Sequence, residues 1–95
     1  MHIITKKRIS EAKKLHPESA SALDGWAKII DKNDFLNFSA LKKLFNNIDK
    51  VGDLIVFDIG GNKLRLIASV HFNRQKLYIR HILTHKTYDK GLWRK

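Results

Sequence analysis

The pattern of apolar residues changes near the middle of the chain, and this change constrains the fold most strongly. In the first half, apolar residues recur at helical spacing, as in the stripe of Leu23, Trp26, Ala27 and Ile30. From residue 54 onward the chain is rich in β-branched and aromatic residues, which favour strands. Helices followed by antiparallel strands predict an α+β fold of two layers.

The first half is predicted to form three helices. Thr5 is a candidate N-cap for a helix over residues 6–15, and Pro17 interrupts that helix. A second helix is expected to begin at about residue 18 or 19, and Ser39 is expected to cap a short third one. One face of the first helix carries apolar residues, namely Ile9, Ala12 and Leu15. The first two helices are expected to form a hairpin that packs on an apolar surface.

Three strands are predicted in the second half, over residues 54–59, 64–72 and 76–83. The connections Gly60–Asn62 and Asn73–Gln75 are short, as in β-hairpins. Residues 2–4 are a candidate edge strand. The sequence therefore predicts a small antiparallel sheet with the helical hairpin packed on one face.

The length and composition set the broad class of the protein. Ninety-five residues predict a single domain over residues 1–95. The chain has no cysteine, so disulfides, thiolate metal sites and a cysteine nucleophile are excluded. No apolar run approaches the roughly 18 residues that a membrane helix needs. We expect a soluble cytoplasmic protein with no membrane association.

The charge of the chain points to its partners. Nineteen Lys and Arg residues against nine Asp and Glu residues give a net charge of +10. A charge this high destabilises a small fold through self-repulsion. A polyanionic partner such as nucleic acid or the ribosome offsets the repulsion. The alternatives are a generally soluble surface or a basic patch covered by an acidic protein.

Alternation along the strands predicts which side chains face away from the helices. Every second residue of the middle strand is apolar and is expected to pack on the helices: Leu64, Leu66, Ala68, Val70 and Phe72. Arg65 lies in the opposite row, and so does Arg80 on the next strand. In that strand one row holds Leu77, Ile79, His81 and Leu83, and the other holds Tyr78, Arg80 and Ile82. Two guanidinium groups on a rigid sheet suit a phosphate, although solvated strand arginines are the simpler alternative.

Groups that can transfer protons follow the last strand. His85, Lys86, Tyr88 and Asp89 lie within five residues of one another. Histidine has the reference pKa nearest neutrality, which suits acid–base catalysis. Loops on rigid scaffolds often carry such groups, although a plain surface turn would have the same composition.

RNA can be cleaved without a metal when its own 2′-hydroxyl attacks the adjacent phosphorus. The protein then removes the 2′ proton, stabilises charge on the phosphorus and protonates the leaving 5′ oxygen. Arg65 and Arg80 suit the charge stabilisation, whereas His85, Lys86 or Tyr88 suit the proton transfers. No cluster of acids suits Mg²⁺, and the five histidines lack a ligand spacing, so no metal or cofactor is predicted. Further RNA contacts are predicted at Asn62, Lys63, His71, Arg74, Lys76 and Arg94.

Two segments, Gly60–Ala68 and Tyr78–Asp89, resemble the HigB toxins of type II toxin–antitoxin systems within the RelE/ParE superfamily. The resemblance implies a RelE-like fold with a basic concave face, and ribosome-dependent cleavage of mRNA within the A site. Arg65 and Arg80 correspond to phosphate-binding arginines of the family. Tyr88 matches an aromatic residue that stacks on a base or assists proton transfer, with His85 and Lys86 as the nearby acid and base candidates.

The resemblance also implies a partner, a HigA-like helix-turn-helix antitoxin. The complex of the two would bind operator DNA, which the toxin would contact through the antitoxin complex alone. ParE-like inhibitors of DNA gyrase share the fold, but the catalytic candidates named above favour the ribonuclease branch. A non-catalytic RNA-binding or ribosome-binding module is a further alternative. Trp93 is expected to pack on the sheet edge, with stacking on RNA as the alternative.

Overall fold

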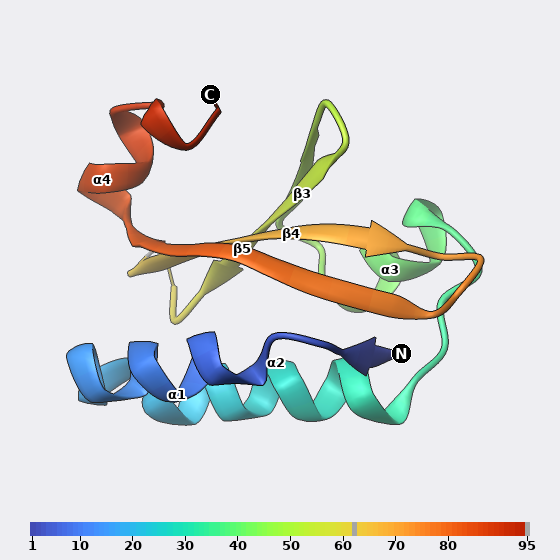
Figure 1. Cartoon of the computed structure of the whole chain (residues 1–95), viewed down its shortest axis with the longest axis horizontal. Coiled ribbons are helices and arrows are strands. Elements are labelled where there is room, and N and C mark those ends of the chain that lie inside the picture. Colours follow the sequence, from blue (N-terminus) through green and yellow to red (C-terminus); the bar gives the residue numbers. More distant parts are fainter. Residues whose placement is uncertain (62, 95) are drawn as a thin grey trace.

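The structure is a computed structural model that describes residues 1–61 and 63–94 (Figure 1). Its helices are α1 (Lys6–Leu15), α2 (Ala20–Lys32), α3 (Phe38–Leu44) and α4 (His85–Asp89), with the 3-10 turns η1 (Pro17–Ser19) and η2 (Leu92–Arg94). Its strands are β1 (His2–Ile3), β2 (Ile48–Val51), β3 (Leu54–Ile59), β4 (Leu64–His71) and β5 (Lys76–Thr84). The predicted α+β class is confirmed, and the three long strands lie where the sequence placed them.

The five strands form one mixed sheet in the order β1-β5-β4-β3-β2. Strands β2 to β5 pair antiparallel, whereas β1 pairs parallel with β5. The prediction of an antiparallel sheet is therefore wrong at this edge. The chain passes from β1 through α1 and α2 before it enters the sheet again, so β1 joins through a long crossover, as parallel pairing requires. The sequence also missed β2, because the polar residues Asp49 and Lys50 interrupt its apolar pattern.

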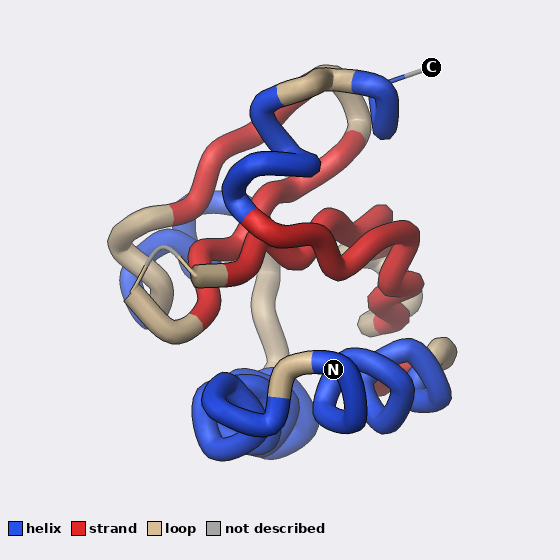
Figure 2. Tube along the Cα trace, turned by 90° about the vertical axis from the view of Figure 1, so that its left-hand side faces the viewer, coloured by secondary structure: helices blue, strands red, loops and turns tan. Residues whose placement is uncertain are grey.

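Two layers are visible in the structure. Figure 1 shows α1 and α2 along one side of the sheet, and α4 with the end of the chain on the other side. Figure 2 gives the same arrangement after a quarter turn, with the two N-terminal helices below the strands. α1 contacts α2 and β5, while α2 contacts β1 and β3. The sheet therefore has one face covered by the helices and a second face that we call the open face.

The main core lies between α2 and the sheet. The predicted stripe of α2 is confirmed, because Leu23, Trp26 and Ile30 are buried there. The indole of Trp26 meets the ring of Phe57 edge-on, with centroids 5.2 Å apart. The predicted row of β4 packs on the same core, with Leu64, Leu66 and Ala68 fully buried and Val70 and Phe72 partly buried.

Three predicted details of the helices are wrong. Leu15 is 76% exposed, because its side chain points about 120° away from that of Ile9 at 3.6 residues per turn. The hydroxyl of Thr5 does not cap α1; it accepts a hydrogen bond of 2.6 Å from the backbone N–H of Ile79 and joins α1 to β5. The cap of α3 is Asn37, whose side chain accepts from the N–H of Ala40, while Ser39 lies within the helix.

A β-bulge interrupts the regular pairing of β4 with β5. Ile67 pairs with His81 and Ala68 pairs with Ile79, so Arg80 is the extra residue. A bulge shifts the alternation of side chains by one position. The predicted rows of β5 are therefore wrong beyond Ile79: Ile82 packs on the main core, and Leu83 packs on the open face. Arg80 itself is exposed.

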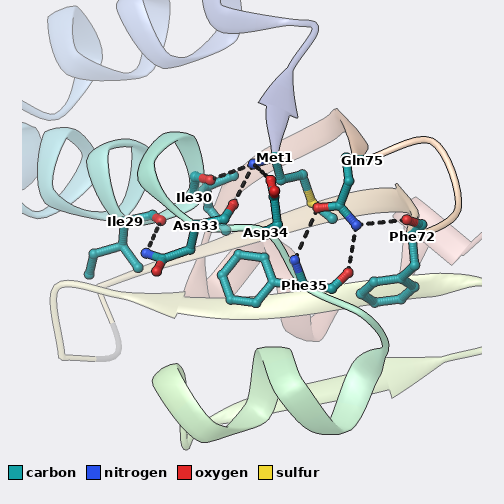
Figure 3. Close-up of polar contacts among 8 residues, drawn as sticks. All are labelled: Met1, Ile29, Ile30, Asn33, Asp34, Phe35, Phe72 and Gln75. Atoms are coloured by element: carbon teal, nitrogen blue, oxygen red, sulfur yellow. Dashed lines mark hydrogen bonds and ion pairs between the residues drawn. The ribbon is translucent and has the colours of Figure 1, made fainter.

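The side chain of Gln75 joins the loop between α2 and α3 to the β4–β5 turn (Figure 3). It accepts a hydrogen bond from the N–H of Phe35 at 3.0 Å, and it donates to the carbonyls of Phe35 and Phe72 at 2.6 and 2.7 Å. In the same region the amino group of Met1 donates to the carbonyl of Ile30 at 3.1 Å. The loop between α2 and α3 is thereby fixed to the β4–β5 turn.

Replacing Gln75 by alanine is expected to lower the free energy of unfolding by about 2–3 kcal/mol, since three hydrogen bonds of about 1 kcal/mol each are lost. Backbone strain is the same in both proteins, because φ of Gln75 is +53° and alanine is strained there too. Gln75→Gly should recover about 1 kcal/mol of the loss. Urea denaturation measures both variants, and equal stability of Gln75→Ala and the parent would contradict the role given to this side chain.

Candidate nucleic-acid interface

The chain after β5 crosses the open face and packs on it (Figure 1). Trp93 is 7% exposed and contacts a second small core made with the buried residues Val56 and Ile67. Its Nε1 donates to the carbonyl of Tyr88 at 3.0 Å. The expected packing of Trp93 is confirmed, but it lies over the inner strands β3 and β4 instead of the sheet edge, because the apolar residues that can cover it lie there.

Four side chains form a connected series on this face, which we call the C-terminal stack. The guanidinium carbon of Arg65 lies 5.6 Å from the centroid of the Tyr88 ring. That ring is stacked on Trp93 with centroids 5.1 Å apart and planes 15° apart, and the guanidinium carbon of Arg94 lies 5.1 Å from the Trp93 ring. Cation–π contacts of this kind each stabilise by about 0.5–1 kcal/mol. A base that stacked on Tyr88 would compete with these neighbours.

An ion pair holds Arg65 in place. Its Nη1 atom lies 2.9 Å from Oδ1 of Asp58, and the two side chains are 15% and 18% exposed. A charged hydrogen bond in a partly buried site is stronger than one in water and fixes the plane of the guanidinium. Sequence reasoning did not assign Asp58 to the site. The signal was present, because Asp58 and Arg65 lie directly opposite each other across the β3–β4 hairpin.

Arg80 lies at a different hollow of the open face, with a volume of about 200 Å³. Its lining residues are Ser69, His71, Arg74, Tyr78 and Arg80. The rings of His71 and Tyr78 meet edge-on with centroids 5.4 Å apart, and Ser69 Oγ lies 3.5 Å from His71 Nε2. Three of the predicted residues are thus brought together, and Tyr78 and Ser69 join them. Two guanidinium groups and an imidazole in one hollow suit a phosphate.

The predicted proton-transfer segment is the short helix α4. Thr84 caps it by accepting from the N–H of Thr87, and His85 Nδ1 lies 2.9 Å from Asp89 Oδ2 one turn later. Both side chains of this pair are at least half exposed, and Lys86 is exposed beside them. The carboxylate orients the imidazole and directs its Nε2 atom away from the pair.

The remaining predicted RNA contacts are spread along β4 and β5. Lys63 is exposed directly before β4, and Lys76 pairs with His71 at the other end of the hairpin. Asn62 lies outside the described residues. Within residues 1–61 and 63–94, no three His, Asp or Glu side chains gather as a metal site would require. Within the same ranges, no helix has the length and apolar character needed to cross a membrane.

His81, which the bulge brings to the open face, was not predicted to belong to the site. It lies in a cavity that Trp93, Arg80 and Arg94 also line. Burial lowers the pKa of His81 below its usual value of 6.5, and the positive charges of Arg8 and Arg80 lower the pKa further. The neutral imidazole is therefore the stable form in the folded protein at neutral pH.

The free energy of unfolding should decrease as the pH falls below about 6.5. In that range the unfolded chain binds a proton at His81 that the folded chain resists, so the stabilisation present above pH 6.5 is lost as the pH falls through the lowered pKa. We expect His81→Gln to show a smaller decrease between pH 7.5 and pH 5.5 in urea denaturation. His2→Gln, at an exposed position, is the control. An unchanged pH dependence in His81→Gln would refute this assignment.

The fold and the open face define a small, strongly basic α+β protein whose exposed strands gather arginine, histidine and aromatic side chains. Such a surface is typical of proteins that bind polyanions. Residues 19–91 match the HigB toxin family, which is described as the RelE-like toxic component of a toxin–antitoxin system. The chain belongs to this family.

Individual relatives are similar in sequence to this protein over almost the whole chain. The mRNA interferase toxin HigB of Escherichia coli K12 is 39% identical over 92 residues, which cover 94% of this chain and 88% of the relative. The mRNA interferase HigB of Shigella flexneri has the same identity and coverage. The mRNA interferase HigB of Escherichia coli O6:H1 is 34% identical over 93 residues, which cover 95% of this chain and 90% of that protein.

Proposed function

We propose that this chain is an mRNA-cleaving toxin, an endoribonuclease that inhibits translation. The observation that carries the proposal is the 39% identity, over 94% of the chain, to a protein named as an mRNA interferase. The net charge of +10 and the arginines of the open face support it, because RNA binding depends on neutralising phosphates. We further propose a single RelE-like domain over residues 1–95, with α1 and α2 as the helical hairpin behind the sheet.

The RNA is proposed to lie on the open face as mRNA bound to the ribosome in the cytoplasm. Arg65, held by Asp58, would bind one phosphate at the C-terminal stack. Arg80 would bind another in the hollow that it shares with His71 and Arg74. Further contacts to the RNA backbone are proposed at Lys63, Lys76, Arg94 and the predicted contact Asn62.

The proposed reaction uses the 2′-hydroxyl of the RNA as the nucleophile and no metal. The bond from the 2′ oxygen to phosphorus forms while the bond from phosphorus to the 5′ oxygen breaks, which leaves a 2′,3′-cyclic phosphate and a 5′-hydroxyl. Nε2 of His85 would take the 2′ proton, since Asp89 already holds Nδ1. The ammonium of Lys86 or the phenol of Tyr88 would protonate the 5′ oxygen. Arg65 would stabilise the charge on the reacting phosphorus, while Arg80 holds the neighbouring phosphate.

Membership of a toxin–antitoxin family implies an antitoxin partner. We propose a HigA-like helix-turn-helix protein in this role, and we propose that the chain meets operator DNA through that complex alone. The strong positive charge favours an acidic surface on the partner.

Inducing the chain in bacteria and sequencing the 5′ ends of transcripts tests the proposal. Growth should stop, and new 5′ ends should appear inside reading frames and disappear when translation is blocked. Intact mRNA during the arrest would refute cleavage. Intact mRNA with a DNA-damage response would instead indicate a gyrase inhibitor, and normal growth with salt-sensitive RNA binding would indicate a non-catalytic module.

A further inference from the structure

A cavity of about 470 Å³ adjoins Arg65 on the open face. It lies between the end of α3 and the strands β2 to β4, and its lining residues are Lys42, Asn46, Asn47, Ile48, Asp49, Val56, Asp58 and Arg65. Its volume falls within the roughly 300–1,000 Å³ that small-molecule sites occupy. Of the described residues assigned above to phosphate binding or proton transfer, Arg65 is the one that lines this cavity.

Arg65 links the cavity to the proposed cleavage site. The ion pair of Arg65 with Asp58 forms one wall of the cavity, and both side chains are less than one-fifth exposed. The same guanidinium lies over the ring of Tyr88 in the C-terminal stack. A phosphate bound at Arg65 would therefore lie at the mouth of this cavity, and the base attached next to it would lie within reach of the cavity.

The chemistry of the cavity fits a nucleobase better than a phosphate. The exposed residues of its rim carry an ammonium, two amides and a carboxylate: Lys42, Asn46, Asn47 and Asp49. The carboxylate of Asp49 would repel a phosphate inside the cavity. The edge of a base presents hydrogen-bond donors and acceptors side by side, which amide and carboxylate groups match. The surface that the cavity offers is therefore mainly polar, with Ile48 and Val56 buried behind it.

We propose that this cavity binds the unstacked nucleobase beside the cleaved bond and selects which base stands there. The inference rests on the proposed function, because it requires that RNA is cleaved at Arg65. Asn46, Asn47 and Asp49 are then specificity-determining residues that read the edge of the base.

The 5′-end sequencing described above tests the inference with the double variant Asn46→Ala/Asn47→Ala and with Asp49→Asn. The parent should prefer one base at a position beside the cut. Each variant should weaken that preference by about tenfold, the factor that a lost pair of base contacts represents. The control is Asn73→Ala, which removes an exposed amide from the β4–β5 turn. It should leave the preference unchanged.

Every outcome of this experiment is informative. Cleavage by the parent with no base preference beside the cut would overturn the inference, and so would unchanged preferences in both variants. Loss of all cleavage in variants with a native circular dichroism spectrum would assign the cavity to catalysis and would also overturn it. If the double variant fails to fold, Asn47→Asp, of the same size, should change the preferred base. Absence of cleavage by the parent would instead refute the proposed function.

Discussion

Replacing Arg65 by alanine is expected to lower the rate of mRNA cleavage by about 100- to 1,000-fold, the range found when one preorganised donor to a developing charge is removed. Arg65 is oriented for this task by Asp58 at 2.9 Å and by the Tyr88 ring. The rate of transcript cleavage after induction measures the effect, and growth arrest should be relieved in parallel. An Arg65→Ala protein that cleaves at the parent rate would exclude Arg65 from the reaction.

A stability control is needed because the substitution also removes the cation beside Asp58. The double variant Asp58→Asn/Arg65→Ala removes both charges of the pair and should be more stable than Arg65→Ala. It should remain inactive if the guanidinium acts on the phosphate. Recovery of activity in the double variant would show that Arg65→Ala had acted through folding.

Replacing Trp93 by alanine is expected to lower the free energy of unfolding by about 3–5 kcal/mol, the usual cost of removing a buried large aromatic side chain. Trp93 is 7% exposed and fills the second core with Val56 and Ile67. Its loss also removes the ring on which Tyr88 stacks, so activity should fall with stability. Thermal and urea denaturation measure the first effect, and transcript cleavage measures the second.

The neighbouring Leu92→Ala substitution is the matched control, because Leu92 is 63% exposed in the same turn. It should change the stability by less than about 0.5 kcal/mol, as exposed substitutions usually do. Trp93→Phe should retain part of the stability, because a smaller ring still covers the open face. A Trp93→Ala protein as stable as Leu92→Ala would show that the C-terminal segment does not pack on the sheet in solution.

Local periodicity predicted the parts of the fold whose side chains face a single environment. The α2 stripe and the alternating row of β4 were predicted correctly because each is buried on one side along its whole length. The bulge at Arg80 was not predictable, since nothing in the alternation of β5 marks an extra residue until the pairing with β4 is known. The parallel pairing of β1 depends on contacts between residues far apart in the sequence, which periodicity does not report.

In the candidate site, too, local patterns predicted single residues but not their contacts with distant parts of the chain. Strand alternation placed Arg65 on the open face, but it could not show that Asp58 is its partner or that Tyr88 and Trp93 cover it. The net charge indicated lysines and arginines as candidate RNA contacts. It could not indicate Asn46 and Asn47, because their side chains carry no charge. The grouping of His71 and Arg74 with Arg80 depends on the pairing of β4 with β5, which no pattern in the sequence reports.

The pairing of β1 with β5 also bears on the order of events during synthesis. β1 can pair with β5 only after Lys76 and Leu77, the partners of His2 and Ile3, have been synthesised. Contacts this distant in the chain slow folding, because the intervening segment must be ordered first. The C-terminal stack requires residues that are made later still. A nascent chain therefore cannot assemble the C-terminal stack on the open face until Trp93 has emerged from the ribosome.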